Sequence, residues 1–157
     1  MYKLFQRILA LALTLGLLLS LAATAFAVEA DEETISISTA EELVEFSANC
    51  RLDTWSENLT VELENDISLE GVAFTPIASF SGTFHGNGYT ISGLSLTEGL
   101  SGAGLFQRVR EGARIEDLNV SGSVKASSAC EAAGGLAGRN AGTIENCSFS
   151  GNIAGSS

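Results

Sequence analysis

The sequence predicts an all-β solenoid, in which successive turns of the chain stack around a shared apolar core. The main observation is a repeat, because the pattern of Gly134–Gly151, GGLAGRNAGTIENCSFSG, recurs in two earlier segments. The second observation is the spacing of Ile91, Ile115 and Ile144, which occupy equivalent places in the three copies. They recur at intervals of about 20–30 residues, which is typical of stacked turns. The third is that no single copy holds enough apolar side chains to form a core alone.

Aligning the copies predicts which side chains share the core. Placing the last copy on the first sets Gly135 on Gly82, and Asn140 on Asn87 at a common corner. The middle copy supplies Gly104-Leu105-Phe106. Stacking at about 4.8 Å then predicts three internal columns, Ile91/Ile115/Ile144, Leu94/Leu118/Cys147 and Leu96/Val120/Phe149. Glycine is expected where the backbone needs positive φ or where turns approach closely.

Residues 1–27 have the pattern of a secretory signal peptide. Two basic residues in Met1–Arg7 precede the apolar run Ile8–Ala23, and Ala25-Phe26-Ala27 supplies the small residues of a cleavage site. We expect cleavage between Ala27 and Val28, which predicts a secreted or cell-surface protein. The alternative is an uncleaved membrane anchor, because the segment Ile8–Ala27 is just long enough to span a bilayer.

Composition narrows the partners of the exported chain. Removing residues 1–27 leaves Val28–Ser157, which is enough for one domain. The leader takes Lys3 and Arg7 with it, so 8 − 2 = 6 Lys and Arg remain against 19 Asp and Glu, and the net charge is 6 − 19 = −13. Such an acidic surface excludes nucleic acid and anionic membranes as partners. Residues 28–34 are charged and lack apolar periodicity, which predicts a flexible leader.

Residues 35–80 are expected to form an N-terminal cap and the first turns. Ile35 and Ile37 alternate with serine, which indicates a short strand. Two overlapping capping boxes, Ser38 with Glu41 and Thr39 with Glu42, predict a helix over Ala40–Asn49. This helix would cover the open end of the first turn, where backbone groups and apolar side chains are otherwise exposed.

The repeat region, residues 81–157, follows further predicted strands. Leu59–Leu63 alternates apolar and polar residues, and Ile67 and Leu69 resume the alternation. The only proline, Pro76, belongs at a bend or an edge because it cannot donate to a ladder. We expect the repeats to continue past Ser157.

The cysteines do not indicate a metal or redox site. Cys50, Cys130 and Cys147 are an odd number and show no C-x-x-C spacing. Cys147 takes the repeat position of leucine, which predicts a small buried apolar residue. A Cys130–Cys147 disulfide is the open alternative in an oxidising compartment.

The last repeat resembles the Glug motif, which reads roughly G-G-L-V-G-x-N-x-G-x-I-x-N-C. The matching residues are Gly134, Gly135, Leu136, Gly138, Asn140, Gly142, Ile144, Asn146 and Cys147, with Ala137 in place of the usual valine. The upstream segment Gly82–Ile91 is similar to the block that commonly precedes such repeats, with His85 in place of an acidic residue. The resemblance implies a right-handed parallel β-helix of the pectate-lyase-like kind. It also implies an exported bacterial surface protein in which the repeat is a scaffold.

An enzyme on such a fold needs clustered acids and a base on one exposed face. The charged candidates are Glu111, Glu116, Asp117, Glu145, Arg108, Arg110, Arg114 and Arg139. Glu116 and Glu145 share a repeat position, which favours a solvated acidic ridge over a weak cation site. The sole histidine, His85, has no partner that the sequence identifies. The sequence contains no H-E-x-x-H, no G-x-S-x-G and no calcium-binding G-G-x-G-x-D turn.

These patterns predict an exported, non-enzymatic scaffold or adhesion module that needs no catalytic residue, metal or cofactor. The partners we expect are a host or cell-surface protein or glycan, and further β-helix repeats or a second copy at the open C-terminal end. One alternative is the non-catalytic N-terminal part of a larger exported metalloprotease or polysaccharide lyase. Another is a glycan-binding module that stacks sugars on Trp55 and Tyr89.

Overall fold

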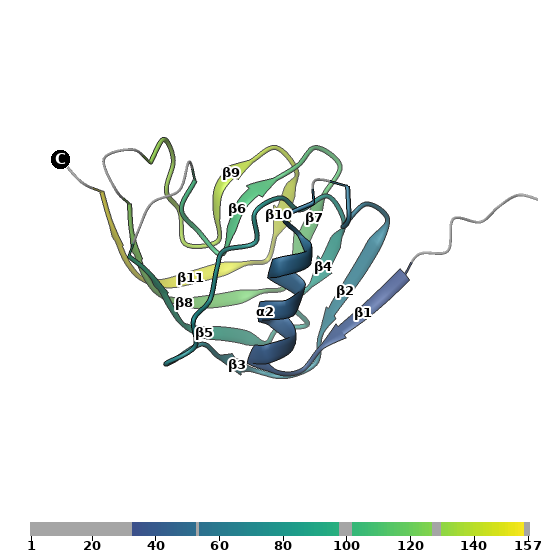
Figure 1. Cartoon of the computed structure of the whole chain (residues 1–157), viewed down its shortest axis with the longest axis horizontal. Helices are drawn as coiled ribbons and strands as arrows, with labels where there is room; N and C mark the ends of the chain where they lie inside the picture. Colours follow the sequence, from purple (N-terminus) through teal and green to yellow (C-terminus); the bar gives the residue numbers. More distant parts are fainter. Residues whose placement is uncertain (1–32, 53, 98–101, 127–129, 156–157) are drawn as a thin grey trace, which may run out of the picture. The chain divides into compact units, whose positions relative to one another are not determined.

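A computed structural model of the whole chain is drawn in Figure 1. The chain divides into two units between residues 31 and 32, and the second unit is Glu32–Ser157. The structure describes residues 33–52, 54–97, 102–126 and 130–155, all in the second unit. The predicted signal peptide with its Ala27–Val28 cleavage site lies outside the described residues. Within them, no helix has both the length and the apolar character needed to cross a membrane.

Three parallel sheets form the walls of a β-solenoid. Sheet A has the order β1 (Glu33–Ile37), β2 (Leu59–Leu63), β4 (Thr83–His85), β7 (Arg114–Glu116) and β10 (Thr143–Glu145). Sheet B has the order β3 (Ile67–Ser68), β5 (Thr90–Leu96), β8 (Asn119–Lys125) and β11 (Ser148–Ala154). Sheet C pairs β6 (Phe106–Val109) with β9 (Ala137–Asn140), and Ile77 and Phe80 bridge to β6. Neighbouring strands in each sheet come from successive turns, as Figure 1 shows.

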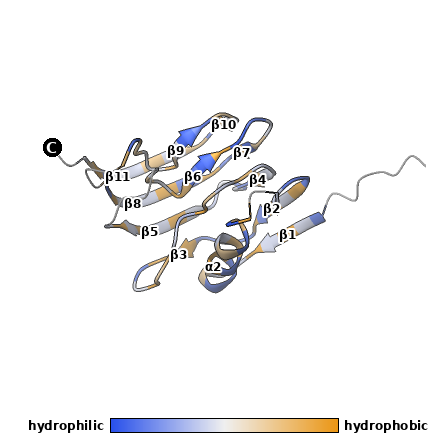
Figure 2. Cartoon of the chain, turned by 45° about the horizontal axis from the view of Figure 1, so that its top comes forward, coloured by the Kyte–Doolittle hydropathy of each residue, from blue (hydrophilic) through white to orange (hydrophobic). Residues whose placement is uncertain are grey.

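The predicted all-β fold with one short helix is therefore confirmed. Every strand pair is parallel. The chain makes about four turns, because each turn adds one of the four strands of sheet B. Figure 2 shows hydrophobic and hydrophilic residues mixed along individual strands, as a wall with one buried face requires. The core includes the fully buried Phe80, Phe84, Phe106, Ile91, Leu105, Ile115 and Leu118.

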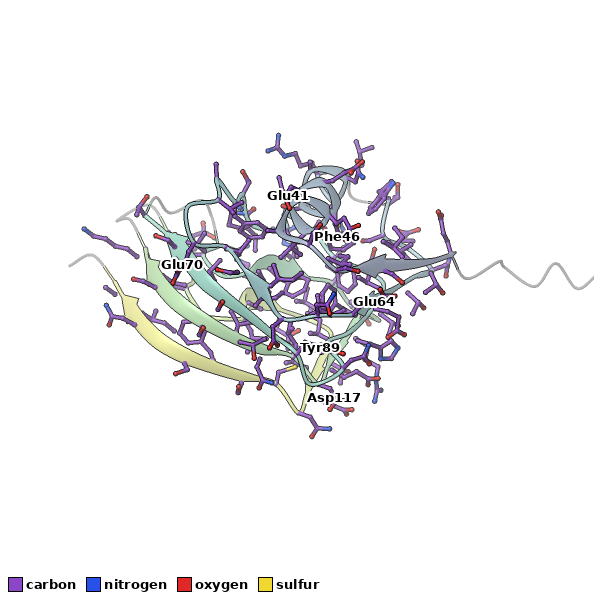
Figure 3. All side chains as sticks on the ribbon, turned by 90° about the horizontal axis from the view of Figure 1, so that it is seen from below. Glu41, Phe46, Glu64, Glu70, Tyr89 and Asp117 are labelled. Carbon is purple, nitrogen blue, oxygen red and sulfur yellow. The ribbon has the colours of Figure 1, made fainter. Side chains whose placement is uncertain are left out.

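The helix α2 (Ala40–Asn49) closes the first turn, as predicted. Of the two capping boxes, the one between Thr39 and Glu42 forms. Leu43 and Phe46 are buried against the first turn, and the Ser47 hydroxyl donates to the carbonyl of Thr75 at 2.5 Å. Figure 3 shows Phe46 on the inner side of α2, and β11 (yellow) on the far side of the stack.

The strand before this helix is longer than predicted. β1 begins at Glu33, so residues 33 and 34 belong to a strand and not to a flexible leader. Glu33 and Thr34 pair with Leu59 and Thr60 of β2. Their backbone groups gain a parallel ladder, which apolar periodicity alone does not reveal.

The register corrects the predicted columns. The sheet A column is Val61, Phe84, Ile115 and Ile144, and the sheet B column is Ile67, Ile91, Val120 and Phe149. The last two copies therefore align as predicted. The predicted alignment of the first copy was wrong. Ile91 stacks on Val120 and not on Ile115, Leu94 pairs with Gly122, and Leu96 pairs with Val124.

The error arises at the corner between sheets A and B. In the second turn this corner is the segment Gly86–Tyr89, whereas in the third turn only Asp117 and Leu118 separate β7 from β8. An alignment that assumes equal spacing in every turn therefore places a residue of sheet B in one turn beside a residue of sheet A in the next turn. The shared corner of Asn87 and Asn140 is wrong for the same reason, because Asn140 lies in β9 opposite Val109 of β6. Asn87, Asp117 and Asn146 are the non-glycine residues with left-handed φ at the described sheet A–B corners, at 53°, 53° and 51°.

Candidate functional site

The Glug-like residues build the last turn of the solenoid. Gly134 and Gly135 precede β9, Asn140 ends β9, and Ile144 lies in β10. A side chain at Gly138 would meet the backbone of Ala103 at 2.9 Å, so this position needs glycine for close approach of two turns. These residues thus hold turns together, which is the structural role that the repeat predicts.

A ladder of charged side chains runs along the outer face of sheet A. Glu62, His85, Glu116 and Glu145 are in register on β2, β4, β7 and β10. His85 Nδ1 lies 2.6 Å from Glu116 Oε1, and His85 Nε2 lies 3.8 Å from Glu62 Oε1. Asn87 adds a hydrogen bond from its amide to Glu62 Oε2 at 2.7 Å. The histidine without a partner in the sequence therefore lies between two carboxylates.

Arg114 extends the ladder to the last turn. Its Nε donates to Glu116 Oε2 at 2.5 Å, and its Nη2 donates to Glu145 Oε2 at 2.6 Å. The hydrogen bond from Arg114 holds the pKa of Glu116 below its ordinary value, and the same bond raises the pKa of Arg114. The predicted alignment of Glu116 with Glu145 is confirmed, but the ridge is not one of like charges alone, because Arg114 and His85 lie within it.

The ladder is an array of paired surface charges. Its acceptors already take hydrogen bonds from His85, Asn87 and Arg114, so it offers few unsatisfied groups to a ligand. Among the residues described, no three His, Cys, Asp or Glu side chains are grouped as metal ligands would be. Asp117 lies at the corner beside this ladder, where its carbonyl accepts from the Gly88 amide at 2.7 Å. The remaining charged candidates, Glu111, Arg108, Arg110 and Arg139, lie away from the ladder on or beside sheet C.

The two aromatic residues of the glycan hypothesis lie at different corners. Trp55 belongs to the segment before β2, and its ring contacts that of Phe46 edge-on, with centroids 5.8 Å apart. Tyr89 lies between β4 and β5 and is 37% exposed (Figure 3). Sugar stacking on either ring stays a prediction.

All three cysteines are free thiols in this structure. Cys50 is completely buried at the end of α2, and burial raises the pKa of its thiol to about 12. Cys147 is half-buried in the last turn, and burial raises the pKa of its thiol as well. The alternative Cys130–Cys147 disulfide is absent from the structure.

The last turn leaves its apolar side chains half-exposed. Ile115, Leu118 and Val124 of the third turn are completely buried. Their counterparts one turn later are not: Ile144 and Cys147 are intermediate in exposure, and Ile153 is 45% exposed. Strands β10 and β11 pair on one side only, and no described strand covers the N–H and C=O groups of their other edges. Sequence reasoning located this turn but did not identify the apolar Ile153.

Comparison with known protein families gives one match. The GLUG motif matches residues 129–154, which include β9, β10 and β11. The match confirms the resemblance in the last repeat and covers less than half of the chain. No curated protein and no solved structure matches the chain.

Proposed function

We propose that the chain is an exported, non-enzymatic β-solenoid module that works by binding other protein chains, as a cell-surface scaffold or adhesion module. The proposal rests on the last turn, where half-exposed apolar side chains lie beside strand edges that no described strand covers. The apolar side chains of a turn in this fold are shielded from water only when a neighbouring turn or chain covers them. A further turn, or a second chain that adds strands in the same way, provides that cover.

The GLUG match supports a structural role for the last turn. Within the described residues, the inner turns already form a continuous core from Leu43 of α2 to Val124 of β8. The outer charges of sheet A are largely paired with one another. Within the described residues, the last turn is therefore where half-exposed apolar side chains and uncovered strand edges lie together, and contact with another chain is the function that it suits best.

The test is association of the full chain after expression in a bacterial host. The intact mass of the exported product tests cleavage before Val28, and light scattering measures its molar mass. We expect concentration-dependent association that Ile153→Lys weakens, because a lysine on an edge strand opposes pairing. The matched control is Leu52→Lys, since Leu52 is 67% exposed near the opposite end of the stack. A sharp monomer at all concentrations, or equal effects of both substitutions, would contradict the proposal.

A further inference from the structure

Strand β11 is the outermost described strand of sheet B, and its free edge lacks the features that usually keep strand edges apart. Edge strands of natural proteins are often short, or they carry a charge or a proline. Other end strands of this chain follow that rule, because β3 has two residues, β1 carries Glu33, β10 carries Glu145 and β9 carries Arg139. In contrast, β11 has seven residues, SFSGNIA, with neither a charge nor a proline. Its edge is therefore suited to pairing with another strand.

The free edge of β11 presents the backbone groups of Phe149, Gly151 and Ile153. The Ser148 amide and the Ala154 carbonyl form hydrogen bonds with backbone groups of the third turn, so the even-numbered residues of β11 face β8. Alternate residues of a strand direct their N–H and C=O groups to opposite sides. The odd-numbered residues thus direct theirs away from β8, toward the edge that no described strand covers.

The apolar side chains of β11 are spaced symmetrically about Gly151. Phe149 and Ile153 are in register with the buried Val120 and Val124 of β8, so both side chains are on the core face. Phe149 is intermediate in exposure, and Ile153 is 45% exposed. Each lies two residues from Gly151, so reversing the strand about this glycine exchanges their positions. The edge of β11 is therefore complementary to an antiparallel copy of itself.

We propose that the partner of the last turn is a second copy of the chain, paired antiparallel through β11 about a two-fold axis at Gly151. This inference rests on the proposed association through the last turn and names its partner and geometry. Phe149 of each copy lies opposite Ile153 of the other, and the two copies of Gly151 face each other. Hydrogen-bonded residues that lie opposite exchange both N–H and C=O groups, so these pairs use all the free edge groups. A cross-strand pair of an aromatic and a β-branched side chain adds stability.

Charge favours this pairing over head-to-tail stacking of copies. A two-fold axis through Gly151 reverses the order of the sheets, so sheet A of each copy lies over sheet C of the other. Glu145 of β10 then comes to the side that carries Arg139 of β9 in the second copy, and Arg139 is itself in register with Arg108 of β6. Head-to-tail stacking would instead set the last turn against α2, where residues such as Glu41 are exposed. The two-fold arrangement therefore covers apolar side chains with apolar side chains and brings opposite charges together.

The test is the molar mass of the exported full chain at rising concentration, together with NMR contacts between copies. Light scattering should level off at twice the monomer mass, because an isologous pairing closes. In an equal mixture of isotope-labelled and unlabelled chains, isotope-filtered spectra should show an NOE between the Phe149 ring and the Ile153 methyl groups. Within one copy these residues are four positions apart on a strand, about 13 Å, which is too far for an NOE.

A charge exchange tests the register independently. The pairing sets Ser150 of each copy opposite Asn152 of the other. Ser150→Lys and Asn152→Glu each bring like charges together across the axis, and each should weaken the dimer. The double variant sets lysine opposite glutamate twice, so it should dimerise at least about threefold more tightly than either single variant. The matched control is Ser148→Glu with Ser150→Lys, which carries the same charges without setting them opposite each other and should show no such gain.

The outcomes separate this inference from the proposed function. A molar mass that rises beyond two chains would overturn the two-fold pairing and leave binding through the last turn standing. A dimer without the Phe149–Ile153 NOE, or an equal gain in the control variant, would do the same. A monomer at all concentrations would overturn both proposals. Thermal unfolding of each variant in the dilute monomer should show that it folds as the parent chain does.

Discussion

The two ends of the solenoid bury the same kinds of side chain to very different extents. At the first turn, α2 covers the core, and Leu43 and Cys50 are completely buried. At the last turn, the side chains that continue the core, Ile144 and Phe149, are half-exposed. The difference shows that the apolar side chains of an inner turn are buried by the neighbouring turns on both sides. The apolar side chains of an end turn are buried only where another element, such as α2, covers them. Apolar repeats alone therefore do not determine how stable a turn is.

Thiol reactivity should show the largest contrast between the ends. Burial raises the pKa of Cys50 to about 12, so it has little thiolate at neutral pH and no access to a reagent. Cys147 lies in the half-exposed last turn. We expect Cys147 to react with a disulfide reagent at pH 8 at least about a thousandfold faster than Cys50. Mass spectrometry of the native chain over time measures both rates, and comparable rates would show that α2 does not seal the first turn.

Truncating one phenylalanine at each end tests the same contrast in stability. Phe46 is 3% exposed and contacts the rings of Trp55, Phe80 and Phe84. Phe46→Ala should lower the free energy of unfolding by about 3–5 kcal/mol. Phe149→Ala should cost less than about half of that, because its ring already contacts solvent. Urea unfolding measures both, and an equal cost would mean that the last turn is covered in solution.

Two asparagines with left-handed φ, at the sheet A–B corners of the second and the last turn, allow the stability of these two turns to be compared. Asn87 donates to Glu62 Oε2 at 2.7 Å and to the Leu63 carbonyl at 3.0 Å, whereas the Asn146 side chain bonds to no described residue. Asn87→Ala should cost about 2 kcal/mol through lost hydrogen bonds and backbone strain, and Asn146→Ala about 1 kcal/mol through strain alone. Glycine at each position relieves the strain. Urea unfolding should show that glycine restores stability at position 146 but only part of it at position 87.

Acid should weaken the link between the third and last turns slightly. Arg114 lowers the pKa of Glu116, so the ionised carboxylate is favoured in the folded chain. This contribution is complete above the unfolded pKa, near 4.5, and is lost as the pH falls toward the lower folded pKa. Glu116→Gln should therefore unfold with a smaller change in stability between pH 6 and pH 3 than the parent chain. Denaturant unfolding at the two pH values measures this change in stability for both proteins. An identical pH dependence would show that Arg114 does not stabilise the ionised carboxylate of Glu116 in the folded chain.

The helix and the last repeat could be located from the sequence because both carry local signals. The capping box of Thr39 and Glu42 and the apolar spacing of Ile144 and Phe149 are each readable within one turn. The position of Ile91 was not readable, because it depends on corner lengths that no local pattern specifies.

The same limit hid the contacts on the outer surface. The contact of His85 with Glu116 joins residues of successive turns, and the Arg108–Arg139 pair joins two turns across sheet C. Each arginine and glutamate was recognisable as a candidate. Which of them became neighbours depended on the register of the parallel strands. A small error in the alignment of two turns assigns a residue to the wrong sheet and therefore to the wrong neighbours.

Native-state hydrogen exchange tests the central claim most directly. The claim is that a turn is shielded from water only when other elements cover it on both sides. In the dilute monomer, amides of β11 should exchange much faster than those of β5 and β8, with opening free energies well below the global value. The amides of β2, beneath α2, should be protected like the inner turns. Equal protection of β11 and β8 in a monomer would contradict the account.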